Sequence, residues 1–291
     1  MKIQYVDHRF SALVRRRIEQ AEEIIAEYEA AGYQITLRQL YYQFVARDLI
    51  PNNQREYKKL GAAIADARLA GLLDWDSIAD RTRGLKGNQH WDDPASILAA
   101  ARDSYLEDLW LDQDYYVEVW VEKDALANVV SRAAQNRDVN WFSCRGYTSL
   151  SEMHVAAMRL QEHQRAGKTV RIIHLGDHDP SGMDMSRDIF DRIETFIGEI
   201  DVRRIALSIE QVRRYRLPHN PAKVTDSRYK KYQEEFGDKS WELDALKPEV
   251  MAKMIDDAIM EVMDTDRFAA AKKAQEKSRG IIAKFVKSCE E

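Results

Sequence analysis

Hydrophobic positions follow a helical period through the first quarter of the chain. Apolar residues recur at helical spacing over Phe10–Ala31, with Ser11 suited to cap the start and Gly32 to end the helix. A second helix is predicted over Thr36–Arg47, where the apolar positions form one stripe. A third is predicted over Asn53–Ala70. The pattern therefore indicates a helical N-terminal region.

From residue 116 onward, short apolar runs alternate with helical stretches. The predicted strands are Tyr116–Val121, Val139–Cys144, Val170–Leu175 and Val202–Ser208. The predicted helices between them are Ala125–Gln135, Ser149–Gln164 and a stretch from Met183 to Ile197. Strands that alternate with helices at this spacing predict a mostly parallel, Rossmann-like sheet. A charged tail from Pro248 onward is predicted to be helical.

The segment between these regions is less regular. A short strand is predicted within 72–83, a turn at 84–87, and a helix from Asp92 to about Leu111. Three helices with a small β element are compatible with a winged-helix domain. The fold class is thus α/β plus a helical domain. We predict a winged-helix-like domain over 1–114, a sheet domain over 115–246 and a helical tail over 247–291.

Composition and charge narrow the function classes. Among 291 residues, 45% are hydrophobic, which excludes wholesale disorder. Two cysteines give no disulfide framework or zinc spacing, and no apolar run or leader predicts membrane insertion, so we expect a soluble, cytoplasmic protein. The net charge of −5 argues against indiscriminate nucleic-acid binding. Residues 201–233, however, carry nine Lys/Arg against three Asp/Glu, which predicts either phosphate contacts or a solvated surface.

Three carboxylates follow two of the predicted strands. Asp177 and Asp179 alternate after one strand, so both can face one hard cation, and Glu122 ends another strand. Acids at strand ends in an open α/β sheet favour a Mg²⁺ site. The alternative is a solvated, helix-capping turn. Between the two aspartates, His178 is expected to be an exposed loop residue, whereas His174, within the strand, is expected in the core.

The second predicted helix carries a pair of tyrosines. Tyr41 falls within the apolar stripe, whereas Tyr42 falls off it and follows Arg38 by one turn. We therefore expect Tyr42 to face solvent beside a guanidinium. A hydroxyl next to a cation is what nucleophilic attack on a phosphodiester requires. The alternative is that the tyrosine is a packing residue.

Several motifs together resemble a known family. The stretches Val121-Glu-Lys-Asp-Ala125, Arg145-Gly-Tyr-Thr-Ser149 and Leu175-Gly-Asp-His-Asp-Pro-Ser-Gly182 look like a Toprim domain. The nearest version is that of the topoisomerase VI A subunit and the related meiotic break-forming proteins. Arg38-Gln-Leu-Tyr-Tyr42 fits the tyrosine motif of that family, and Trp241-Glu-Leu-Asp-Ala-Leu246 resembles a C-terminal segment of it. The short topo mini-A relatives of bacteria, phages and plasmids resemble the chain in length.

The resemblance implies a DNA-cleaving topoisomerase activity. Tyr42 would attack a DNA phosphodiester and form a 5′-phosphotyrosyl link, while Arg38 contacts the phosphate. Glu122, Asp177 and Asp179 would hold Mg²⁺, for which Mn²⁺ can substitute. The family further implies a homodimer that breaks both strands of nucleoid DNA. The chain has no glycine motif for ATP, so ATP-driven strand passage would need a separate GHKL ATPase partner.

Four basic residues are candidate DNA contacts: Lys123, Arg145, Arg213 and Arg214. Two other functions stay open. In one, the protein is a Toprim metal nuclease that uses water as nucleophile, and the tyrosine only packs. In the other, it is a DNA-binding or partner-regulating module without catalysis.

Overall fold

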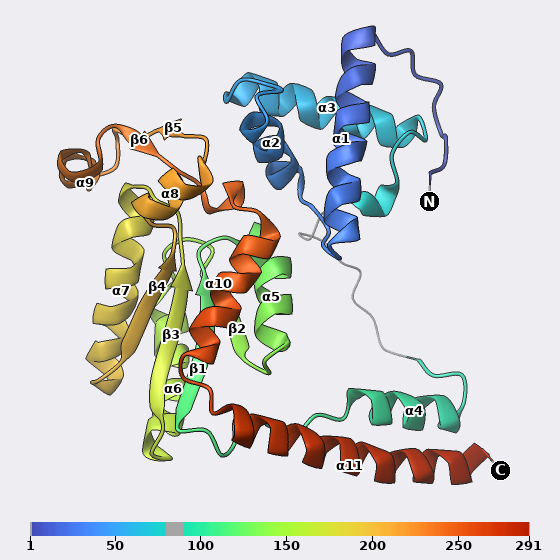
Figure 1. Ribbon diagram of the computed structural model, residues 1–291, viewed down its shortest axis with the longest axis vertical. Coiled ribbons are helices and arrows are strands. Elements are labelled where there is room, and N and C mark those ends of the chain that lie inside the picture. Colours follow the sequence, from blue (N-terminus) through green and yellow to red (C-terminus); the bar gives the residue numbers. More distant parts are fainter. Residues whose placement is uncertain (1, 80–89, 291) are drawn as a thin grey trace.

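A four-stranded parallel sheet organises the larger half of the chain (Figure 1). In the computed structural model, which describes residues 2–79 and 90–290, the strand order is β2-β1-β3-β4. The strands are β1 (Tyr115–Val121), β2 (Asn140–Ser143), β3 (Thr169–Leu175) and β4 (Asp201–Ala206). This confirms the α/β class. Because β2 and β3 lie on opposite sides of β1, the chain reverses direction across the sheet between β1 and β3, where such sheets form ligand sites.

Helices cover both faces of the sheet. Helices α5 (Ala127–Gln135) and α10 (Pro248–Met260) pack together on one face, and α6 (Leu150–Arg165) and α7 (Pro180–Ile197) pack together on the other. Alternate residues of β1 divide between these layers, as a strand requires: Val119 joins the α5 and α10 core, and Trp120 joins the α6 and α7 core. A short 3₁₀ turn, η2 (Asp124–Leu126), links β1 to α5.

Three helices form a separate N-terminal cluster, at the top right of Figure 1. They are α1 (Ala12–Ala30), α2 (Leu37–Ala46) and α3 (Gln54–Leu69). The predicted cap at Ser11 is confirmed by a hydrogen bond from the first turn, and Thr36 forms a reciprocal capping box with Gln39. Asn53 also caps α3, because its side chain accepts a hydrogen bond from the first turn. The apolar stripes of the helices meet in one core.

The region between the N-terminal cluster and the sheet departs in part from prediction. In place of the strand predicted within 72–83, the described residues form a 3₁₀ turn, η1 (Trp75–Ser77), and Ile78 makes a single parallel bridge to Ile35. The last four residues of that strand and the turn at 84–87 lie outside the described residues. Helix α4 (Pro94–Ser104) ends before Leu111, so the helix predicted there is too long.

The C-terminal part completes the sheet half and reaches back to both other regions. It contains α8 (Ile209–Tyr215), α9 (Tyr229–Phe236), η3 (Leu243–Ala245) and an antiparallel pair, β5 (Asn220–Pro221) and β6 (Lys239–Ser240). The η3 turn contacts α2, and the last helix, α11 (Thr265–Glu290), packs along α4 (Figure 1). Among the described residues, no helix has the length and apolar character needed to cross a membrane.

Candidate functional site

The predicted carboxylates meet at the switch point between β1 and β3. The backbone N–H of Glu122 donates to Leu175 at the end of β3, at 2.9 Å. The backbone N–H of Asp177 in turn donates to Glu122 Oε2 at 2.8 Å. Burial and the neighbouring charge of Asp179 raise the pKa of Glu122. The three acids therefore lie near one another at this edge of the sheet.

The loop that carries the two aspartates is held by the side chain of Arg204 from β4. Its guanidinium donates to the backbone carbonyls of Gly176 at 2.9 Å, Asp177 at 2.6 Å and Gly182 at 2.9 Å. Burial lowers the pKa of Arg204, while Glu122 and Asp177 oppose that shift. A guanidinium has five N–H donors in one plane, so Arg204 can bind several backbone carbonyls of one loop at once. Arg204 was not among the predicted site residues.

Gly182 leaves room for this turn. A Cβ at Gly182 would overlap the carbonyl oxygen of Asp177 and lie 3.0 Å from Glu122 Oε2. We therefore expect Gly182→Ala to lower the free energy of unfolding by about 1–3 kcal/mol, because the backbone must shift. Gly280→Ala is the matched control, since no atom lies within 4 Å of its added Cβ. In urea denaturation, the control should be neutral or slightly stabilising; equal losses in both variants would contradict this account of the turn.

The two aspartates have different environments. Asp177 is 5% exposed; its Oδ1 accepts from the backbone N–H of Leu243 at 2.8 Å, and its Oδ2 lies 2.7 Å from Lys123 Nζ. Burial raises the pKa of Asp177, and Lys123 opposes the shift. Asp179 is half-buried and caps α7 through a 2.6 Å hydrogen bond from Gly182 N–H. The capping role that was the alternative prediction is thus present at Asp179.

Lys123 is surrounded by acids. Its ammonium pairs with Asp177, Glu242 and Asp244, the last at 2.9 Å. We call these four residues the Lys123 cluster. Burial alone would lower the pKa of Lys123, but the three carboxylates outweigh it and raise that pKa. The side chain is 18% exposed, so Lys123 is not a solvated surface charge.

Arg38 connects the Lys123 cluster to the tyrosine helix. Its Nη2 donates to Glu242 Oε2 at 2.8 Å, and its Nε lies 3.7 Å from Asp244 Oδ2. Its guanidinium carbon lies 5.9 Å from the centre of the Tyr42 ring. Burial would raise the pKa of Glu242, but Lys123 and Arg38 together lower it. Two cations and three carboxylates therefore meet across the seam between the helical and sheet halves.

The prediction that Tyr42 faces solvent is wrong. The side chain is 4% exposed, because β5 and η3 cover the face of α2 that lacks the apolar stripe. Its hydroxyl accepts a 3.2 Å hydrogen bond from Asn220 Nδ2. Burial, reinforced by Glu242, raises the pKa of Tyr42 to about 12, although Asn220, Arg38 and Lys123 act in the opposite direction. The predicted neighbourhood of Arg38 and Tyr42 is confirmed.

The predicted exposure of His178 is also wrong, whereas His174 is buried in the sheet as expected. His178 exchanges two backbone hydrogen bonds of 2.9 Å with Trp241, and its Nδ1 lies at hydrogen-bond distance, 2.8 Å, from the Tyr232 hydroxyl oxygen. The rings of Trp241, Tyr232 and Phe236 pack around it. This bridge places the segment after residue 241 beside the aspartate loop.

Sequence reasoning gave no role to Glu242 and Asp244. Asp244 is fully buried, and its Oδ1 has no hydrogen-bond partner among the described residues. One sequence signal existed: in Trp241-Glu-Leu-Asp-Ala-Leu246, two acids alternate with apolar residues, as in a segment that packs into a core. Acids in such a stretch are rarely buried unless they are paired, so they indicated a cation nearby.

The remaining candidate DNA contacts lie on the surface. Arg145 is exposed in a left-handed conformation (φ 50°), with its Nε 3.3 Å from Asp124. Arg213 and Arg214 are exposed on α8, and the guanidinium of Arg214 lies 5.5 Å from the ring centre of Tyr215. These three residues do not contact the Lys123 cluster in the interactions that the described residues make.

An ion-pair group at the start of α7 gives a pH prediction. Partial burial would raise the pKa of Asp184, but hydrogen bonds from Arg187 (2.8 Å), Arg228 (2.7 Å) and Tyr147 (3.0 Å) lower it to about 2. A lowered folded-state pKa stabilises the fold above the ordinary value of 3.8, and this stability is lost as pH falls toward about 2.

We therefore expect Asp184→Asn to be less stable than wild type at neutral pH, with a gap that closes as pH falls from about 4 to about 2. Urea denaturation across this range measures the gap. A gap that is constant with pH would contradict an ionic role for Asp184.

The donor set at the switch point suits a hard cation, because carboxylate oxygens are the ligands that Mg²⁺ prefers. Within 2–79 and 90–290, no group of three or more His, Cys, Asp or Glu side chains is arranged as a ready metal site. Metal binding by Glu122, Asp177 and Asp179 stays a prediction. Comparison of the chain with protein-family models, curated proteins and solved structures found no match.

Proposed function

We propose that this chain cleaves duplex DNA by transesterification, with Tyr42 as the nucleophile, in the manner of a topoisomerase VI A subunit with a Toprim domain. One observation carries the proposal. Tyr42 and Arg38, from a helix near the N-terminus, lie at the same seam as Lys123 and the carboxylates of the sheet switch point. A tyrosine hydroxyl, two cations and several acids at one site suit chemistry on a phosphodiester.

The residues divide the reaction between them. The Tyr42 oxygen forms a bond to phosphorus while the bond from phosphorus to the 3′ oxygen breaks, and that oxygen leaves with a proton as a 3′-hydroxyl. Because the pKa of Tyr42 is raised to about 12, the phenol is protonated at neutral pH and must lose its proton during attack. Asn220 orients the phenol, and Arg38 binds phosphate oxygens once they displace Glu242.

Glu122 and Asp179 would hold a Mg²⁺ or Mn²⁺ ion. Asp177 would join them once its ion pair with Lys123 is broken, and the ion would supply positive charge at the phosphate.

We further propose that two copies of the chain act together, since a duplex has two strands and each chain has one Tyr42. A separate GHKL ATPase would be needed for ATP-driven strand passage. Arg145, Arg213 and Arg214 would contact the DNA backbone outside the seam.

A second candidate is a metal-dependent nuclease that uses water. The burial of Tyr42 favours it, because a tyrosine that is 4% exposed must be uncovered before its hydroxyl reaches phosphorus.

The test uses purified full-length protein, end-labelled duplex DNA, and Mg²⁺ or Mn²⁺, with the reaction stopped by SDS. We expect cut DNA whose 5′ ends carry protein that proteinase K removes. Cuts with free 5′ ends would replace the proposal with the water nuclease. DNA binding without any cut, with either ion, would contradict both activities and favour a non-catalytic module.

A further inference from the structure

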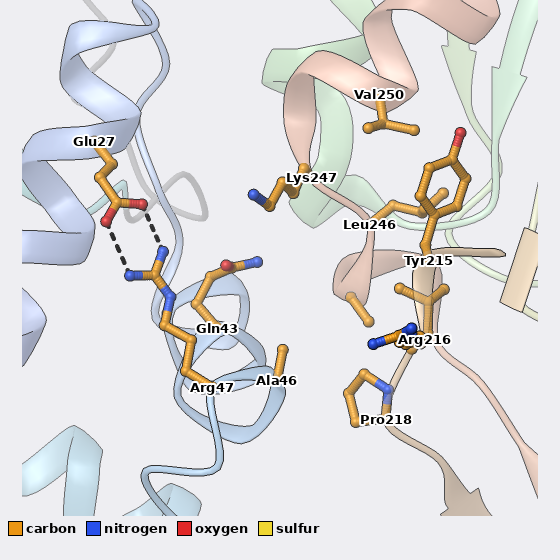
Figure 2. Close-up of a pocket in the computed structure, with 12 residues that line it drawn as sticks. Glu27, Gln43, Ala46, Arg47, Tyr215, Arg216, Pro218, Leu246, Lys247 and Val250 are labelled. Carbon is orange, nitrogen blue, oxygen red and sulfur yellow. Dashed lines mark hydrogen bonds and ion pairs between the residues drawn. The ribbon is translucent and has the colours of Figure 1, made fainter. Parts of the chain in front are cut away.

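A cleft lies between the helical half and the sheet half, with α2 on one side of it (Figure 2). Its volume is about 520 Å³, within the range of about 300–1,000 Å³ that small-molecule sites occupy. One wall is formed by α1 and α2. The other is formed by residues 215–218, after α8, and 245–250, at the start of α10. The cleft therefore has the size of a ligand site and two walls from different parts of the chain.

Positive charge dominates this cleft. Arg216 and Lys247 line it, are exposed, and form no ion pair with any residue in 2–79 or 90–290. Arg47 also lines it and is held by Glu27 at 2.5 Å. A hydrogen bond from Arg47 lowers the pKa of Glu27, and the charge of Lys247 acts in the same direction from the opposite wall. Three cations and one carboxylate leave an excess of positive charge facing the space between the walls.

Gln43 adds a polar group to the same cleft. The residue is 3% exposed, its side-chain amide makes no hydrogen bond with any described residue, and neither amide atom is fully enclosed. Figure 2 shows this amide turned toward the space between the walls, where the ends of Lys247 and Arg216 also point. The amide is therefore free to hydrogen-bond a ligand atom in the cleft.

We propose that this cleft binds a phosphate-bearing anion of about mononucleotide size. The phosphate lies between Arg216 and Lys247, because guanidinium and ammonium groups are the usual partners of phosphate and neither is otherwise paired. The Gln43 amide hydrogen-bonds the ligand, and the organic part of the ligand packs on Leu246 and Val250. The bound ligand touches both walls and so holds α2 against the sheet half, one residue from Tyr42.

The test measures binding alone, so it does not depend on DNA cleavage. Inorganic phosphate and adenosine monophosphate are titrated calorimetrically into the full-length protein at low salt. We expect saturable binding of the nucleotide at one site per chain, tighter than that of phosphate. The double variant Arg216→Gln/Lys247→Gln should weaken nucleotide binding about a hundredfold, roughly tenfold for each lost charged hydrogen bond, and Gln43→Leu about tenfold.

Lys253→Gln is the matched control, since it removes an exposed lysine of α10 that pairs with Asp257 and does not line the cleft. It should bind the nucleotide within about twofold of wild type. Absence of saturable binding, an unchanged affinity in the double variant, or an equal loss in Lys253→Gln would overturn the proposal. A short duplex that displaces the nucleotide would identify DNA phosphate as the occupant; a duplex that does not would identify a free phosphorylated molecule.

Discussion

A Tyr42→Phe protein should fold normally and lose covalent attachment to DNA by at least about a thousandfold, as expected when a nucleophile is removed. Phenylalanine preserves the buried ring and its 5.3 Å contact with Tyr41. Only the hydrogen bond from Asn220 is lost, so the free energy of unfolding should fall by about 1 kcal/mol. Quantifying the protein-linked 5′ ends after an SDS stop measures the loss.

Tyr41→Phe is the matched control. Tyr41 is equally buried, and its hydroxyl donates to Asn52 at 2.8 Å, so its replacement removes a comparable hydrogen bond one position earlier. It should retain covalent attachment to DNA within about tenfold of wild type, because it loses only a nearby stabilising contact and keeps the Tyr42 nucleophile. Equal activity in wild type and Tyr42→Phe would show that the tyrosine is a packing residue. Equal losses in both variants would assign the effect to packing of α2.

Lys123→Met should be the most destabilising single change at the site. It leaves Asp177, Glu242 and Asp244 without the ammonium that pairs with all three. Removing one partner of a buried ionic group costs about 3–5 kcal/mol, because the remaining charges stay in a poorly solvated place. Urea denaturation should report this loss. Lys253→Met, which breaks an exposed pair with Asp257, should change stability by less than about 1 kcal/mol.

A second substitution sharpens this test. Adding Asp244→Asn to Lys123→Met removes one of the unpaired carboxylates, so the double variant should be more stable than Lys123→Met alone. If Lys123→Met were as stable as wild type, the three acids would not depend on the ammonium. If the second substitution gave no recovery, the lost stability would come from the lysine's packing.

Much of the fold follows from local patterns. The caps at Ser11, Thr36 and Asn53 were predictable because a capping side chain bonds to its own first turn. The central strands β1 and β3 were predictable because strands buried on both faces form nearly continuous apolar runs. The proximity of Glu122 and Asp177 could also be predicted from the sequence. They follow β1 and β3, and the carboxyl ends of neighbouring parallel strands lie at one edge of the sheet.

The errors have one physical cause. Helical periodicity assigns a polar face to solvent, but it contains no information about which distant segment will cover that face. Tyr42 is covered by Asn220 and η3, about 180 and 200 residues further along the chain. His178 is likewise enclosed by Trp241 and two rings of α9. The Lys123 cluster was not predicted because its acids come from two segments, at residues 177 and 242–244, that are both far from Lys123 in the sequence.

The contact between α2 and η3 also has a consequence for the order in which the chain is made on the ribosome. The helical cluster is complete once about the first quarter of the chain has emerged, and domains generally fold as they emerge. The partners of Arg38 at Glu242 and Asp244 are synthesised more than 200 residues later. A nascent chain that stops before β5 would therefore present an uncovered Tyr42 beside an unpaired Arg38, and the seam closes only when the last quarter of the chain is made.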